Sequence, residues 1–207
     1  MKPTQRFGLS VLLVVAIALP ALAYEYPLSS TSIREAYLLG NRRDEHTAEF
    51  FAQYTHHFPA AKTGPYVDEI GIETPFSQVV EHCGSAYNYH SQDAEEEFRN
   101  KPMFFRAHVQ IFRFPVFSPE ATLTYAPDYW KDFKIQLMQD KEIPSKTVYA
   151  ELLYPPTDQD YGTSLPIGVR VEFEYDAERV DNAPATVKVT MPDGQEIEST
   201  FNLERLR

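Results

Sequence analysis

Two kinds of periodicity divide the chain near residue 101. Over residues 30–100, apolar residues recur at the spacing of one face of a helix, with one strand-like interruption. After Lys101-Pro102, apolar and polar residues alternate, which is the period of a half-buried strand. The pattern predicts a helix-rich part over residues 24–100 and a strand-rich part over residues 101–207.

Capping signals set the expected ends of the helices. Ser32 followed by Glu35 is a capping-box pattern, in which the hydroxyl and the carboxylate each satisfy a free backbone N–H. Thr74 before Pro75 is a second start signal, because proline at the first helical position lacks an N–H that would be unpaired anyway. The four expected helices run from Ser32 to a stop at Gly40-Asn41, from Asp44 to His57, from Pro75 to Cys83, and from Ser91 to about Arg99.

The alternating segments predict a mainly antiparallel sheet or sandwich. Pro192-Asp193-Gly194-Gln195 is the clearest hairpin turn, since proline fixes its own φ and glycine accepts a positive φ. Short links between polar-faced strands favour an α+β protein, with the helical N-terminal part packed on the C-terminal strands. We expect one compact unit over residues 24–207. The expected strands cover residues 66–73, 105–111, 133–137, 147–154, 168–176, 185–191 and 196–203.

The N-terminus has the three zones of a secretory signal. Lys2 and Arg6 precede an apolar run over residues 11–19, and the small-residue pattern Ala21-Leu22-Ala23 follows. The run is shorter than the roughly 20 residues that span a bilayer, so we expect cleavage after Ala23 rather than a retained anchor or a buried helix. The leader predicts a bacterial protein exported to the periplasm or beyond, with no membrane segment after cleavage.

Composition narrows the class of partner. The chain has 207 residues, 43% of them hydrophobic, and a formal charge of −11, which falls to −13 if Lys2 and Arg6 are removed with the leader. Nucleic-acid binding is not expected, because phosphate contacts need a basic surface. No phosphate-binding glycine loop, dinucleotide fingerprint or serine-hydrolase elbow is found, and we expect no cofactor.

Reactive side chains are densest around the only cysteine. The residues His82, Cys83, Tyr87, Tyr89 and His90 lie within nine positions. An imidazole that lowers the pKa of the thiol would make a nucleophile, and one Cys with two His would supply three zinc ligands. The alternative is a thiol packed inward at a helix end, with both histidines at the surface. His56 and His57 are expected at the polar end of a helix, and His108 on the polar face of a strand.

A second candidate is aromatic. Tyr125, Tyr129 and Trp130 lie close together in a loop-like segment, where exposed rings would stack on a sugar or contact another protein. The alternative is that Trp130 caps the core while the tyrosines keep their hydroxyls in water. An open sheet edge would be a further binding mode. The sequence thus favours a non-enzymatic binding or interaction module for a protein or carbohydrate, with a metal-dependent or thiol enzyme near His82, Cys83 and His90 as the alternative.

Overall fold

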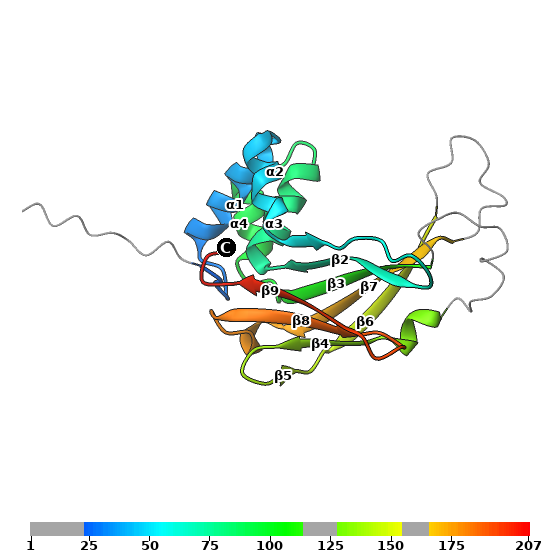
Figure 1. The fold of residues 1–207 in the computed structure, drawn as a ribbon. Helices are drawn as coiled ribbons and strands as arrows, with labels where there is room; N and C mark the ends of the chain where they lie inside the picture. Colours follow the sequence, from blue (N-terminus) through cyan, green and yellow to red (C-terminus); the bar gives the residue numbers. More distant parts are fainter. Residues whose placement is uncertain (1–22, 114–127, 155–165) are drawn as a thin grey trace, which may run out of the picture.

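In its described part, the computed structural model is an α+β fold with four α-helices and two antiparallel sheets (Figure 1). It describes residues 23–113, 128–154 and 166–207. The helices are α1 (Ser30–Arg42), α2 (Glu45–Ala52), α3 (Pro75–Ser85) and α4 (Ser91–Phe98). The strands are β1 (Thr55–His57), β2 (Tyr66–Glu73), β3 (Phe104–Phe112), β4 (Lys134–Met138), β5 (Glu142–Ile143), β6 (Thr147–Leu153), β7 (Gly168–Asp176), β8 (Pro184–Thr190) and β9 (Glu196–Asn202).

The two sheets are built from both parts of the chain. The larger has the order β1-β2-β3-β7-β6 and the smaller the order β5-β4-β8-β9. The helix-rich part therefore contributes β1 and β2 to a sheet whose other strands come from the C-terminal part. The change of periodicity near residue 101 marks a change of local structure and not a boundary between sheets.

The inner faces of the two sheets form the main core. On β3 the alternate residues Phe105, Ala107, Val109 and Ile111 are fully buried, as the period of two predicts. They belong to one hydrophobic cluster with the inward side chains of the smaller sheet, such as Val187. Because the inner faces of the two sheets are buried against each other, the two sheets form a sandwich.

The helices have a second core of their own. Ile33, Val79, Val80 and Cys83 are fully buried in a cluster between α1, α3 and α4. Figure 1 shows the helices gathered at one end of the sandwich, on the side where the C-terminus lies. In the described part of the chain, no helix has both the length and the apolar character to span a membrane.

Helix α1 begins before and ends beyond the expected positions. Ser29, not Ser32, is the N-cap, and its hydroxyl accepts the Ser32 N–H at 3.2 Å. Gly40 does not stop the helix, which runs on to a left-handed Arg43. The glycine instead permits a close helix contact, because a Cβ built on Gly40 would lie 2.2 Å from the Val80 carbonyl oxygen of α3.

The second expected helix was too long. Helix α2 ends at Ala52, and His56 and His57 lie on β1, where His57 pairs with Glu69 of β2. Pairing with β2 supplies these residues with backbone hydrogen bonds that the helix would otherwise have provided. A strand of three residues is too short to show a period of two, so no hydrophobic pattern indicates it.

His108 faces away from the core residues of β3, as the alternation predicts, but it is only 5% exposed. It pairs with Gly71 of β2, and a Cβ there would lie 2.4 Å from the imidazole. The missing side chain leaves room for the ring, whose Nε2 lies 3.0 Å from Glu69 Oε1. The polar face of the larger sheet is thus partly packed.

The hairpin turn at Pro192–Gln195 is confirmed. It joins β8 to β9, with Gly194 at a φ of 85°. The Gly194 N–H donates to the Met191 carbonyl at 2.9 Å, which closes the turn.

Candidate functional site

The structure brings together only some of the reactive residues around Cys83. The Tyr89 hydroxyl donates to Glu97 Oε2 at 2.8 Å, and the Tyr89 ring lies 5.1 Å from the His82 ring. Cys83 is 0% exposed in the helical core, and burial, helped by the nearby Glu97 carboxylate, raises its pKa to about 11. The neighbouring His82 side chain is part-exposed, and its Nε2 lies 3.5 Å from Glu97. Consecutive helical residues point about 100° apart, which explains why the thiol and the imidazole diverge.

The other two members of this group serve the start of α4 or face solvent. Tyr87 is 90% exposed. The backbone N–H of His90 donates to Asp93 Oδ2 at 2.8 Å and so caps the helix. Within residues 23–113, 128–154 and 166–207, no three His, Cys, Asp or Glu side chains are grouped so as to hold a metal ion. The geometry favours a packing role for Cys83.

We expect Cys83 to be inert in the folded protein. With a pKa of about 11, only about one thiol in a thousand is a thiolate at pH 8, and the side chain is shielded as well. Alkylation by iodoacetamide, followed by mass spectrometry, should be at least about 100-fold slower in native protein than in concentrated urea. Rapid labelling without unfolding would restore the thiol as a nucleophile.

The aromatic candidates are mostly used by the core. Tyr129 is 5% exposed, and its hydroxyl donates to the Ile111 carbonyl at 2.8 Å instead of remaining in water. Trp130 is partly buried against the same core, with Lys131 Nζ 5.9 Å from its ring centroid. Tyr125 lies outside the described residues. The packing of Tyr129 leaves little of its ring to stack on a sugar.

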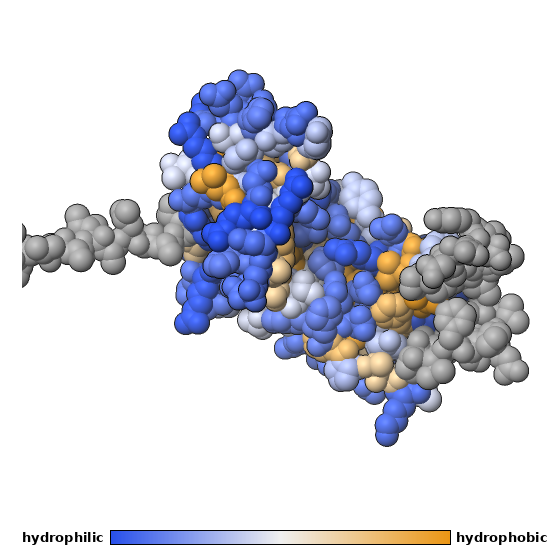
Figure 2. Space-filling view, turned by 90° about the horizontal axis from the view of Figure 1, so that it is seen from above, coloured by the Kyte–Doolittle hydropathy of each residue, from blue (hydrophilic) through white to orange (hydrophobic). Residues whose placement is uncertain are grey.

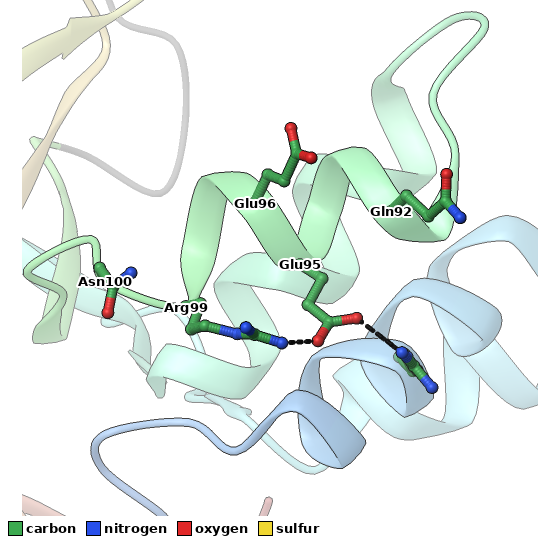
Figure 3. A pocket seen from close by; sticks show the side chains of 6 residues that line it. Gln92, Glu95, Glu96, Arg99 and Asn100 are labelled. Carbon is green, nitrogen blue, oxygen red and sulfur yellow. Dashed lines mark hydrogen bonds and ion pairs between the residues drawn. The ribbon is translucent and has the colours of Figure 1, made fainter.

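A polar, open hollow of about 610 Å³ lies between α1 and α4. Figure 3 shows Glu95 in its centre, between two arginine side chains. Glu95 accepts from Arg34 at 2.8 Å and also pairs with Arg99, so each guanidinium already has an anionic partner. The hollow is therefore better described as an ion-pair network that ties α4 to α1 than as a ligand site.

A second charged network lies on the polar face of the larger sheet. Arg106 lies within 3.5 Å of three carboxylates, on Glu73, Glu172 and Glu174. Burial raises the pKa of Glu73, and Glu81 and Glu172 add to that rise. The Arg106 guanidinium offsets part of the repulsion among the three carboxylates and joins β2, β3 and β7, so the network stabilises strand register.

Strand β6 differs from the groups described above because it carries exposed hydrophobic side chains. Of the large exposed hydrophobic residues in the described chain, Val148 (41% exposed), Tyr149 (54%) and Tyr154 (55%) lie on β6 or directly after it, and only Leu38 and Tyr87 lie elsewhere. Figure 2 shows hydrophobic residues gathering at the end of the molecule away from the helices. Exposed apolar side chains that cluster on one element mark an interaction surface.

The backbone of β6 is also open on one side. It is the last strand of the larger sheet, and within the described ranges β7 is its only strand partner. An edge strand presents a row of unpaired N–H and C=O groups to any extended chain that approaches. The seven residues of β6 contain no proline and no lysine, and Glu151 carries their only charge.

The other edges are protected. Strands β1 and β5 have three and two residues, too few to serve as a long template. Strand β9 is longer, but it carries the charged residues Glu196 and Glu198, which oppose edge pairing. The His56 side chain of β1 also contacts two buried residues of β9, with its Nδ1 hydrogen-bonded to Ser199 Oγ and its ring stacked on Phe201 at 4.7 Å. Strand β6 is thus the long unguarded edge of the described sandwich and the candidate functional site.

The side chains of β6 divide between two faces. Val148, Ala150 and Leu152 stand opposite Phe173, Val171 and Val169 of β7, which belong to the core face. Tyr149 and Glu151 stand opposite Glu172 and Arg170, on the polar face. A strand added at this edge would meet apolar residues on one face and a phenol with a carboxylate on the other.

The sequence predicted this strand but gave no indication of its position in the sheet. The signal that was available is the absence of proline and lysine from residues 147–153, since these residues commonly protect edges. Searches with protein-family models, against curated proteins and against solved structures find no match to this chain.

Proposed function

We propose that the protein is an exported, non-enzymatic interaction module that binds another polypeptide by strand addition to β6. The observation that carries the proposal is the combination of an unpaired strand edge with exposed Val148 and Tyr149 on the same strand. In strand addition, backbone hydrogen bonds supply affinity and alternate side chains supply specificity. Export is the part of the proposal that rests on the leader at residues 1–23.

The exposed surface of β6 favours a bound state on physical grounds. A strand of seven residues with one charge and no proline is prone to pair with any extended chain, including misfolded ones. A bound partner would cover the apolar side chains and satisfy the open backbone groups together. The other long edge, β9, carries Glu196 and Glu198, so the low charge of β6 is a local property and not a general one of this fold.

The alternative of a metal-dependent or thiol enzyme has less support. It depends on His82, Cys83 and His90 being close in sequence, whereas the thiol is buried and the His90 backbone caps a helix. A carbohydrate ligand has less support as well, because Tyr129 is buried with its hydroxyl bonded to the backbone. Strand addition uses the exposed groups that these two alternatives leave unexplained.

The proposal is tested by selecting peptides from a random phage-displayed library on the immobilised exported form of the chain. We expect the selected peptides to be extended, with alternating apolar residues, and to bind about tenfold or more weakly to Val148→Lys, because a lysine on an edge strand opposes pairing. Affinities would be measured by biolayer interferometry.

Leu38→Lys is the matched control, because Leu38 is 63% exposed on α1, far from the edge in sequence. It should leave the affinity of the selected peptides unchanged. Peptides that bind Val148→Lys as well as they bind the unmodified chain would show that β6 is not the binding site.

A further inference from the structure

We infer that the strand added at β6 is the β6 of a second copy of this chain, so that two copies join antiparallel across a two-fold axis at Ala150. The inference rests on the proposed function and names its partner. It would unite the two larger sheets into one continuous ten-stranded sheet, since each contributes five strands. The order of the side chains along β6 and their exposure support this pairing.

Strand β6 is self-complementary about its midpoint. Residues 147–153 have Ala150 at their centre, so antiparallel pairing about Ala150 uses the whole strand. Val148 then faces the second copy's Leu152, and Tyr149 faces the second copy's Glu151. Apolar residues meet apolar residues on one face, and on the other a phenol hydroxyl meets a carboxylate that it can donate to.

The residue on the axis fits the geometry. Two identical side chains face each other there, with Cβ atoms about 4.5–5.5 Å apart. Ala150 is the smallest side chain of β6, and it is exposed in the single chain. Alanine at this position lets the two backbones pair without a steric conflict between bulky groups or a conflict between like charges.

Neighbouring registers on the same faces are worse. A shift that puts Glu151 on the axis brings two carboxylates directly opposite each other, which is destabilising. A shift that puts Tyr149 on the axis leaves Leu152 and Leu153 beyond the end of the second copy's β6. The register about Ala150 pairs all seven residues and separates the only two charges.

The salt dependence of association distinguishes a second copy of this chain from a basic partner. Each copy carries a formal charge of −11 as a full chain, so two copies repel each other at long range. Salt screens this repulsion, with a Debye length of about 8 Å at 0.15 M ionic strength. Self-association should therefore become tighter between about 0.02 M and 0.15 M salt, whereas a basic polypeptide partner would bind more weakly over the same range.

The test is sedimentation equilibrium of the exported form of the chain and of two variants, Ala150→Lys and Ala150→Glu. We expect the unmodified chain to form a dimer, and each variant to raise the dimer dissociation constant about tenfold or more, because identical charges face each other on the axis. An equimolar mixture of the two variants should restore the dimer, because lysine then faces glutamate.

If the mixture forms the dimer, the variants are folded and each alone fails only at the interface. Circular dichroism of each variant checks the fold directly. A monomer at all concentrations, or a dimer that both variants leave intact, overturns the inference. If the chain is monomeric but peptides selected on it still lose affinity for Val148→Lys, strand addition at β6 stands and the second copy is the wrong partner.

Discussion

Replacing Gly40 by alanine is expected to lower the free energy of unfolding by about 2 kcal/mol. A Cβ at this position would lie 2.2 Å from the Val80 carbonyl oxygen, which is backbone and can move only if α1 and α3 separate. Overpacking of this kind costs about 1–3 kcal/mol or occasionally more, while alanine returns up to about 1 kcal/mol of helix propensity. The steric cost wins because the clash is severe, and urea unfolding followed by circular dichroism measures the difference.

Two further substitutions serve as comparisons, each with a smaller expected loss of stability. Gly84→Ala should cost less, because its Cβ would meet the Gly40 carbonyl oxygen at 3.2 Å, a contact that a small shift relieves. Leu38 lies on α1, as Gly40 does, but is 63% exposed, so Leu38→Ala should change the free energy of unfolding by less than about 0.5 kcal/mol. A Gly40→Ala protein more stable than the parent would mean that the helices are not held at this distance.

Replacing Arg106 by methionine is expected to destabilise the fold by about 2 kcal/mol at pH 7. Its guanidinium is the common partner of Glu73, Glu172 and Glu174, and without it these carboxylates repel one another while still partly buried. The loss is smaller than for a fully buried ion pair, since the Arg106 side chain is 33% exposed.

The deficit should shrink as the pH falls. Burial already raises the pKa of Glu73, and loss of Arg106 removes a cation that opposes that rise. A folded-state pKa above the unfolded value means that the folded protein binds protons more readily, so lowering the pH restores stability to the variant. Urea unfolding at pH 7 and at about pH 4.5 would measure the recovery.

Lys146→Met provides the matched control, because it removes an exposed ion pair with Asp176 from the same sheet region. That change should cost at most about 0.5 kcal/mol. An Arg106→Met deficit that is equally large at both pH values would indicate lost side-chain packing as its cause, and not repulsion among the three carboxylates.

The α+β class was predictable because the longer strands keep a strict period of two. The alternation of residues 105–111 places Phe105 and its partners in the core, and the structure confirms it. Strands β1 and β5 were missed because two or three residues carry no period. The end of α1 was misplaced because Gly40 was interpreted as a helix stop, whereas its role comes from α3, forty residues further along the chain.

The candidate site was less predictable than the fold for a physical reason. A sequence indicates that residues 147–153 form a strand, but whether that strand lies at an edge depends on the order of strands in the sheet. That order is set by contacts between distant segments. The group at His82 and Cys83 is the opposite case, since side chains that are adjacent in sequence point apart on a helix.

The contact of His56 with Ser199 and Phe201 has a consequence for how far association can proceed. The contact holds β1 against buried side chains of β9, and Glu196 and Glu198 place two charges on β9, so β6 is the edge best suited to strand pairing in the described part of each copy. When two copies join at β6, the β6 edge of each copy is paired with that of the other. Growth would then stop at a pair, and the same strand that favours joining would not lead to fibres.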